Sequence, residues 1–300
     1  MITFKMILEE AKKVQAKKLV VPCARKSDLD AIGQAATAGL ISPCLIGNGK
    51  KLEAMIANKL PALREYEIVD DKNPLNSAIN LIREGRADII MQGGTNQRIF
   101  INSISDRETG LRKTALLSYV SLFELQQPKK LILITDTFVN NNPAFDEKRQ
   151  ILDNALVLAD ILRIDKPKVA VLAAIEQVNA NIPSTLDAAI LSKMSERKQF
   201  GEAIVEGPLD IDCALSRKAA ERKGLKSIVP GNADIYLVPE IDTGFLLAEA
   251  LVFLGSMTTA GTLLGGTNPV ITDIPFATPE SRIMEIALAV LMCRKRAHHV

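Results

Sequence analysis

Short runs of apolar, largely β-branched residues alternate along the chain with longer segments in which apolar positions recur at helical spacing. The apolar runs predict strands at residues 18–23, 43–47, 66–70, 88–92, 130–136, 168–173, 203–207, 227–230, 234–239 and 269–272. These runs are apolar without alternation, which is typical of strands buried on both faces of a parallel sheet. The segments between them are long enough to form crossover helices.

The helical periodicity predicts helices at residues 28–39, 74–85, 147–162, 186–194, 213–224 and 243–255. Four of these segments stop at a glycine in the position expected of a helix C-terminus, namely Gly39, Gly85, Gly224 and Gly255. Strand and helix alternate throughout, so the sequence predicts a doubly wound α/β architecture. The length of 300 residues favours two domains, with a boundary near residues 126–130 (QQPKK).

Composition excludes several classes of partner. Lys and Arg number 37 against 35 Asp and Glu, and aromatic residues make up 4% of the chain, so neither charge nor base stacking indicates a nucleic acid. No apolar run is long enough to span a bilayer, and the N-terminal segment lacks the apolar centre of a signal peptide. The sequence therefore predicts a cytoplasmic protein without a membrane partner.

Cysteine and histidine usage limits the chemistry further. The four cysteines are scattered, so buried thiols are expected rather than a zinc site or disulfides. The two histidines, His298 and His299, lie at the extreme C-terminus, which excludes a histidine base or a Ser-His-Asp triad within the fold. Acid–base work must fall to Asp, Glu, Lys, Tyr or Cys.

Five loops after predicted strands are rich in small and polar residues: 91–98, 135–143, 173–185, 206–212 and 264–269. Ligands of open parallel sheets bind at loops past the carboxyl ends of strands. The tetrapeptide GGTN occurs in two of the loops, at residues 93–96 and 265–268. Its first copy could offer backbone N–H groups to an anion ahead of a helix that starts near Asn96, with Arg98 close by; a plain turn is the alternative.

Two further loops carry candidate polar residues. Ser184 or Thr185 is expected to cap a helix, with or without a ligand contact. Asp210 and Asp212 could hold a metal or act as bases, or they could be helix-capping and first-turn acids. Together the loops predict an anion-tolerant cleft in which Asp and Arg serve in place of His.

The same loops carry a resemblance to a known family. Its densest parts are Ile134-Thr135-Asp136, Gly110-Leu111-Arg112 and residues 167–194, 206–215, 219–244 and 286–289. In these segments, and over nearly the whole chain, the sequence resembles the phosphate acetyltransferase/phosphate butyryltransferase family, and is nearest the butyryl branch.

The resemblance implies a fold of the isocitrate/isopropylmalate dehydrogenase-like type, with two doubly wound α/β domains around a cleft. The C-terminal segment is then expected to return to the first domain. The first domain therefore comprises residues 1–128 and 269–300, and the second comprises residues 129–268. It also implies an enzyme that converts acyl-CoA and phosphate to acyl phosphate and CoA, with a short acyl group such as butyryl or acetyl. Coenzyme A is a substrate, no cofactor or metal is expected, and the protein is expected to be a homodimer.

The resemblance also implies roles for individual residues. The catalytic residues are expected to be Asp136, Ser184 and Thr185. The residues expected to bind phosphate or CoA are Gly93, Gly94, Thr95, Asn96, Arg98, Arg112, Glu176, Gly207 and Asn268.

This chain departs from the family at polar positions. The family's Ser-Arg pair near the C-terminus falls on Ile274-Pro275, and its following Asp falls on Ala277. Gln92 stands where the family has a Lys. Phe245 stands where the family has the Asn of a Gly-Asn pair, and Glu249 stands at the position of the Lys that follows. Loss of one preorganised donor typically lowers a rate by about two to three powers of ten, so these losses bear directly on activity.

Three hypotheses follow. The first is a working phosphate acyltransferase with a rearranged site, in which Arg98, Arg107 or Arg282 replaces the lost cations, or in which Ser281-Arg282 takes the Ser-Arg role. The second is an enzyme with a changed substrate or acceptor, because Phe245 and Ile274 suit a more apolar ligand. The third is a non-catalytic protein that still binds acyl-CoA or an active relative.

Overall fold

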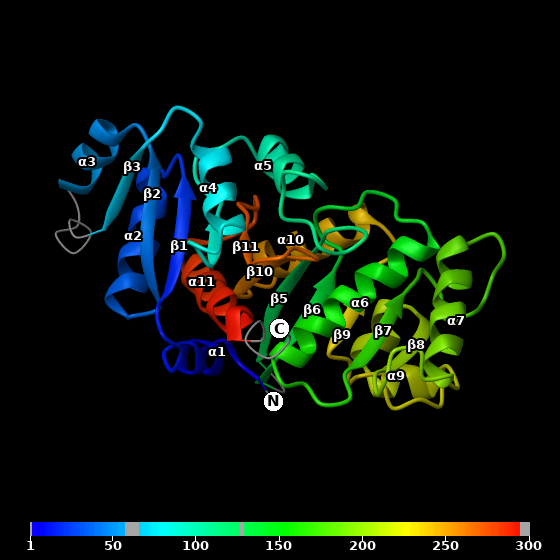
Figure 1. Cartoon of the computed structure of the whole chain (residues 1–300). Coiled ribbons are helices and arrows are strands. Elements are labelled where there is room, and N and C mark those ends of the chain that lie inside the picture. Colours follow the sequence, from blue (N-terminus) through cyan, green and yellow to red (C-terminus); the bar gives the residue numbers. More distant parts are fainter. Residues whose placement is uncertain (1, 58–65, 127–128, 295–300) are drawn as a thin grey trace. The chain divides into compact units, whose positions relative to one another are not determined.

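The computed structural model describes residues 2–57, 66–126 and 129–294, and the chain packs as two compact units (Figure 1). Unit 1 comprises Met1–Thr3 and Ser118–Met257, and unit 2 comprises Phe4–Leu117 and Thr258–Val300. The domain ranges given above stay a prediction. His298 and His299 lie outside the described residues, as does part of the predicted boundary at 126–130.

Unit 2 is built on a sheet with strand order β3-β2-β1-β4-β11-β10. Its strands are β1 (Lys17–Pro22), β2 (Ile41–Gly47), β3 (Glu67–Asp70), β4 (Ile89–Met91), β10 (Thr259–Leu264) and β11 (Val270–Ile271). Neighbouring strands are parallel except β10, which runs antiparallel to β11. The parallel strands β1, β4 and β11 therefore end at the same edge of the sheet.

The helices of unit 2 are α1 (Phe4–Ala11), α2 (Lys26–Thr37), α3 (Gly49–Ala57), α4 (Pro74–Arg83), α5 (Gln97–Ser105) and α11 (Pro279–Arg294). Helix α11 packs against α1 and α2, and α4 packs on β1 and β2. The apolar run Ile286, Ala287, Leu288, Ala289 and Val290 of α11 is fully buried. Helices on a mainly parallel, apolar sheet are what the hydrophobic pattern predicts.

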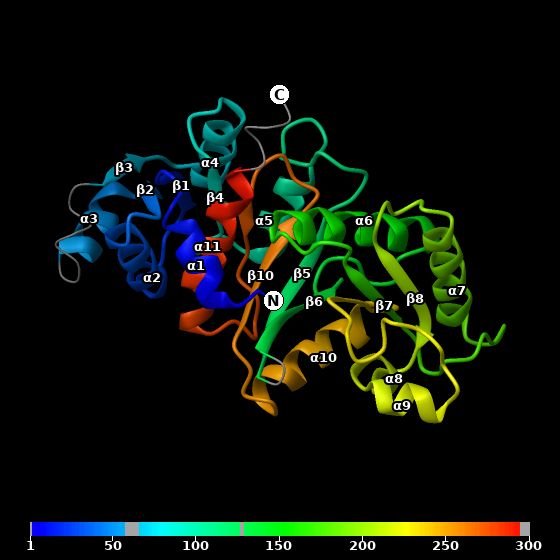
Figure 2. The ribbon, with the colours of Figure 1, turned by 90° about the horizontal axis from the view of Figure 1, so that it is seen from below.

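Unit 1 is built on a sheet with strand order β5-β6-β9-β7-β8. Its strands are β5 (Ser118–Gln126), β6 (Lys129–Thr135), β7 (Lys168–Leu172), β8 (Ile204–Leu209) and β9 (Ile235–Leu237). Its helices are α6 (Phe145–Ile161), α7 (Pro183–Glu196), α8 (Ile211–Leu215), α9 (Arg217–Arg222) and α10 (Ile241–Phe253). Strands β5 and β6 are antiparallel and the other pairs are parallel. Helices α6 and α10 lie on opposite sides of β6 (Figure 2).

The predicted α/β class is confirmed, with some corrections to single elements. The strand predicted at 227–230 is a loop, and the helix predicted at 213–224 is divided by Ser216 into α8 and α9. The backbone of Ser216 is extended, and its hydroxyl accepts the Ala219 N–H to start α9. Strands β5 and β10 were not predicted.

The predicted helix ends can be checked at the glycines. Gly39, Gly85 and Gly224 have φ values of 72°, 70° and 78°, which confirms them as left-handed C-terminal residues. Gly255 also stands where predicted, directly after the cap residue Leu254 of α10, but there the left-handed residue is the following Ser256, with φ 49°.

Two predictions from composition can also be compared with the structure. All four cysteines are free, but the prediction that all are buried is wrong for Cys23, which is exposed after β1. Among the described helices, none combines the length and apolarity needed to cross a bilayer.

Candidate active site

The loops after β1, β4 and β11 meet at one edge of the unit 2 sheet. The Gly94 N–H donates to the carbonyl oxygen of Cys23 at 2.6 Å, so the first GGTN loop rests on the end of β1. A Cβ atom on Gly93 would lie 2.2 Å from the carbonyl oxygen of Pro22, so the close approach of the two backbones requires glycine here.

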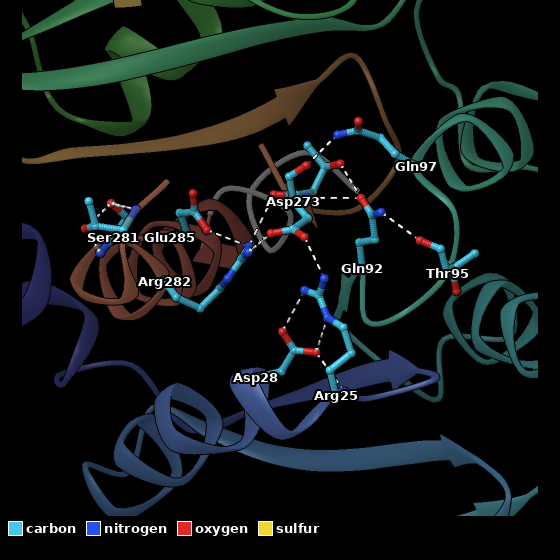
Figure 3. Close-up of polar contacts among 11 residues, drawn as sticks. Arg25, Asp28, Gln92, Thr95, Gln97, Asp273, Ser281, Arg282 and Glu285 are labelled. Atoms are coloured by element: carbon cyan, nitrogen blue, oxygen red, sulfur yellow. Dashed lines mark hydrogen bonds and ion pairs between the residues drawn. The ribbon is translucent and has the colours of Figure 1, made fainter. Parts of the chain in front are cut away.

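Gln92 joins two of these loops (Figure 3). Its Oε1 accepts the hydroxyl of Thr272 at 2.6 Å and the N–H of Asp273 at 3.0 Å, while its Nε2 donates to the carbonyl oxygen of Thr95 at 2.9 Å. The side chain is buried, and Gln97 Nε2 also donates to the Asp273 carbonyl oxygen. Gln92, at the position where the resemblance leads us to expect a lysine, thus holds two loops together through a neutral side chain.

Asn96 begins helix α5, as predicted. Its side-chain oxygen accepts the N–H of Ile99 at 3.2 Å, which satisfies one donor of the first helical turn. The Thr95 hydroxyl is buried and makes no hydrogen bond within the described part of the chain. Arg98 is exposed on α5.

A network of charged side chains lies beside the Gln92 clamp (Figure 3). Asp273 Oδ2 is 2.7 Å from Arg25 Nη1, and Asp273 Oδ1 is 2.7 Å from Arg282 Nη2. Arg25 is also held by Asp28, at 2.9 and 3.1 Å, and Arg282 by Glu285, at 2.8 Å. One carboxylate thus bridges two guanidinium groups, each fixed from behind by a second carboxylate.

A pocket of about 570 Å³ within unit 2 adjoins this network. It is lined by Arg25, Ser27, Asp28, Asp30, Ala31, Gln34, Asp273, Ala277, Thr278, Glu280, Arg282, Ile283 and Met284. Sequence reasoning did not single out Arg25, Asp28 or Asp273, although Arg25 and Asp273 each follow a predicted strand.

Glu285 is the most deeply buried member of the network. Burial raises its pKa to about 7, and repulsion from Asp273 adds to the rise, whereas the neighbouring Arg282 opposes it. The native state therefore holds a proton on Glu285 over a pH range in which the unfolded chain has released it.

We expect this proton to make stability depend on pH. Because the native pKa is above the unfolded value of 4.5, the contribution of Glu285 falls as pH rises from about 4.5 to about 7, by about 3 kcal/mol at most. Measured by urea unfolding, the free energy of unfolding should therefore fall more between pH 5 and pH 8 for the wild type than for Glu285→Gln. Equal losses in the two proteins would contradict this assignment.

The positions that the resemblance assigns to Ser-Arg and Asp carry no polar side chain in this chain. These positions are Ile274, which is buried, Pro275, which is exposed, and Ala277, which is half-buried. Ser281 is buried in the first turn of α11, where its hydroxyl accepts the Thr278 N–H at 3.1 Å. The structure thus gives Ser281 a helix-capping contact and Arg282 an ion-pair role.

The second GGTN copy does not join the first. Strand β10 runs antiparallel to β11, so the loop at 264–269 lies at the opposite end of the strands from the loop at 91–98, which corrects the expectation of a common edge. Asn268 is buried and donates to the Asp88 carbonyl oxygen at 2.9 Å. Arg112 is half-buried, pairs with Gly266 in a β-bridge and donates to the Ala115 carbonyl oxygen at 3.2 Å.

In unit 1, Asp136 organises the loop after β6. Its Oδ1 accepts the N–H groups of Phe138 and Val139 at 2.8 and 3.0 Å, and its Oδ2 accepts the N–H of Asn140 at 3.2 Å. Asp136 is 3% exposed. Burial raises its pKa, against the opposing effect of these hydrogen bonds. The Asp136 carboxylate thus holds the backbone of residues 138–140 in a tight loop.

An aromatic group lies on that loop. Phe138 stacks on Phe245 at 6.3 Å between ring centroids and meets Tyr119 edge-on at 5.7 Å. Gly244 allows the approach, because a Cβ there would lie 2.5 Å from the Asp136 carbonyl oxygen. Phe245 therefore adds an apolar wall beside the Asp136 loop.

Glu176 belongs to a carboxylate cluster around an ammonium group. Lys223 Nζ contacts Asp210 and lies 3.0 Å from Asp212 and 3.6 Å from Glu176. Burial raises the pKa of Asp210, but hydrogen bonds from Cys213 and Lys223 outweigh it and lower the pKa to about 2. The carboxylates that suggested a metal site thus surround the ammonium group of Lys223.

Three further predicted residues lie in unit 1, namely Ser184, Thr185 and Gly207. The prediction that Ser184 or Thr185 is the N-cap is wrong, because α7 begins at Pro183 with Ile182 at the cap position. The buried Thr185 hydroxyl donates to the Ile182 carbonyl oxygen at 2.7 Å and accepts the Asn179 N–H at 2.9 Å, so it fixes the entry to the helix. Gly207, in β8, lies against Val171, whose Cβ would be 2.8 Å from an added Cβ.

Comparison with known proteins adds to this geometry. Residues 64–291 match the family described as phosphate acetyl/butaryl transferase. The chain is 34% identical over 294 residues to the phosphate butyryltransferase of Clostridium acetobutylicum, covering 97% of this chain and 98% of that protein. It is 36% identical over 275 residues to the phosphate acetyltransferase of Rickettsia felis, covering 90% of this chain and 78% of that protein.

A solved structure agrees with these matches. The crystal structure of a branched-chain phosphotransacylase from Enterococcus faecalis superposes with a TM-score of 0.79 at 26% identity, covering 92% of this chain and 98% of that one. The match extends over both compact units, and the family resemblance seen in the sequence is confirmed. The chain belongs to the phosphate acetyl/butaryl transferase family.

Proposed function

We propose that the protein transfers a short acyl group between coenzyme A and inorganic phosphate. Membership in the family, with 34% identity over 294 residues to a phosphate butyryltransferase, carries the proposal. In the reaction a phosphate oxygen attacks the thioester carbon, the carbon–sulfur bond breaks, and the thiolate leaves and takes up a proton. The products are acyl phosphate and CoA.

The reaction needs donors for the phosphate and for the carbonyl oxygen that becomes negative in the transition state. Candidate donors in unit 2 are the backbone N–H groups of residues 93–96 other than that of Gly94, which bonds to Cys23. The Arg112 guanidinium, which lies beside the loop at 264–269, is a separate candidate. The loop that Asp136 organises in unit 1, with the Phe138–Phe245 pair, is the candidate surface for the acyl chain. Asp136, Ser184 and Thr185 are the proposed catalytic residues. The proposed binding residues also include Arg98, Glu176, Gly207 and Asn268.

A second candidate is an altered member of the family that binds acyl-CoA but uses another acceptor, or none. Two observations favour it: the apolar Ile274 is buried where the resemblance expects a polar residue, and the carboxylate of Asp273 already pairs with two arginines. The two candidates differ in their dependence on phosphate.

The test is release of CoA thiol from acetyl-, butyryl- and branched acyl-CoA, with and without phosphate. The proposed reaction requires that release depend on phosphate for at least one acyl chain. Folded protein that binds CoA but releases none would exclude acyl transfer to phosphate and leave the second candidate.

We also propose that the protein works in the cytoplasm without a cofactor and as a homodimer. Helix α10 supports the last point, because Leu246, Phe253 and the adjoining Leu254 are 64, 67 and 87% exposed. Apolar side chains gathered on one helix are typical of a surface covered by a partner.

We expect Leu246→Glu to weaken a dimer that buries α10, because it places a charge in an apolar interface. Light scattering after size exclusion should show a dimer for the wild type and a larger monomer fraction for the variant. Val157→Glu, on an exposed site of α6, is the matched control and should remain dimeric. A monomeric wild type, or equal effects of both variants, would refute this interface.

A further inference from the structure

Arg25 and Arg282 hold the carboxylate of Asp273 as a pair of donors would hold an oxyanion. Each of its oxygens is 2.7 Å from a guanidinium nitrogen, one from Arg25 and one from Arg282. Charge-assisted hydrogen bonds from two guanidinium groups to two oxygens of one anion are the geometry in which arginines bind phosphate and carboxylate ligands.

The two guanidinium groups are fixed independently of Asp273. Asp28 accepts from Nε and Nη2 of Arg25, which leaves Nη1 for the bridge. Glu285 and the carbonyl oxygen of Thr272 hold Nη1 of Arg282, at 2.8 and 3.2 Å, which leaves Nη2. The donors would therefore keep their places if the bridging carboxylate left.

The side chain of Asp273 can move away from the two arginines. Its side chain is 34% exposed, whereas that of Arg282 is 10% exposed. Its backbone is held separately, because its N–H donates to Gln92 and its carbonyl oxygen accepts from Gln97. Rotation of the side chain toward solvent would leave the loop in place.

We propose that Arg25 and Arg282 form a binding site for inorganic phosphate, and that the carboxylate of Asp273 covers this site when no anion is bound. The two arginines are the only cationic side chains among the lining residues of the adjoining 570 Å³ pocket, so an anion there has one place to bind. Because the Asp273 carboxylate competes for both arginines, the wild type should bind phosphate weakly. The choice of phosphate rests on the proposed function; the site itself does not.

The test is a phosphate titration of the thermal unfolding midpoint at constant ionic strength, with chloride as the replaced anion, because a ligand that binds the native state raises the midpoint. Asp273→Asn removes the competing charge and keeps the shape of the side chain. We expect it to bind phosphate at least about tenfold more tightly than the wild type, because the negative charge that repels the anion and competes for both arginines is removed.

Glu280→Gln is the matched control, because it removes one negative charge from the same pocket and Glu280 forms no ion pair with either arginine within the described residues. It should leave phosphate affinity close to that of the wild type. Adding Arg25→Lys to Asp273→Asn keeps the charge but removes the planar donor pair, and should reverse most of the gain.

Three results would overturn the proposal: a folded Asp273→Asn that responds to phosphate as the wild type does, an equal gain in Glu280→Gln, or a response to formate without one to phosphate. Asp273→Ser replaces Asp273→Asn should that variant not fold. If the enzyme turns over, KM for phosphate should fall in Asp273→Asn while KM for acyl-CoA is unchanged. The titration measures binding and does not require catalysis. It would therefore still test the phosphate site if the protein had no acyltransferase activity.

Discussion

Replacing Asp136 by Ala should lower the free energy of unfolding by about 3 kcal/mol and remove most activity. The carboxylate accepts three backbone N–H groups, from Phe138, Val139 and Asn140, and no other acceptor takes its place in the variant. A donor left without a partner in a buried site costs about 1–3 kcal/mol, and these residues are only half-buried, so water offsets part of the sum. Urea unfolding and CoA release measure the two effects.

Asp165→Ala is the control for this variant. Asp165 belongs to the same unit and is exposed, so its removal should change stability by less than about 0.5 kcal/mol. If Asp136→Ala proved as stable as Asp165→Ala, the carboxylate would not hold the loop. If it were destabilised and yet fully active, the loop would not belong to the active site.

Replacing Gly93 by Ala should destabilise unit 2 by about 3 kcal/mol and disrupt the first GGTN loop. The added methyl group would lie 2.2 Å from the Pro22 carbonyl oxygen and 2.9 Å from the carbonyl carbon and oxygen of Cys23. These are backbone atoms at the end of the central strand β1, so relief requires the loop itself to move. The displacement would separate the loop from Gln92 and Asp273.

Gly49→Ala is the matched control in the same unit. The nearest atoms to its added Cβ belong to the side chain of Asp70, the closest at 3.3 Å, and Gly49 begins helix α3, where Ala is favoured. Its stability should stay within about 1 kcal/mol of the wild type. A Gly93→Ala protein as stable as Gly49→Ala would contradict the close packing of the loop on β1.

The hydrophobic pattern predicted most strands because their side chains are apolar on both faces. It missed β5 and β10 because buried polar or small residues interrupt them. In β5, Ser118 accepts from Asn154 and Ser121 bonds to Thr137, so hydroxyls that read as surface residues are satisfied in the core. In β10, Thr, Ala and Gly fill a strand that is buried throughout. The loop at 227–230 was mistaken for a strand because it places Val229 in the core.

The candidate site was predicted in part. Loops after strands could be identified, but Arg25 and Asp273 are 248 residues apart, and no local pattern links them. In the sequence, Gln92 is noted only because the resemblance leads us to expect a lysine there, whereas its three hydrogen bonds join two loops. Such roles depend on which strands are neighbours, which spacing along the chain does not encode.

The central claim is that this protein makes acyl phosphate from acyl-CoA. The most direct measurement is to incubate the enzyme with butyryl-CoA and phosphate and trap the product with hydroxylamine as the acyl hydroxamate. We predict hydroxamate in proportion to the CoA released, and none when phosphate is omitted. CoA release without hydroxamate, or release at the same rate without phosphate, would contradict the claim.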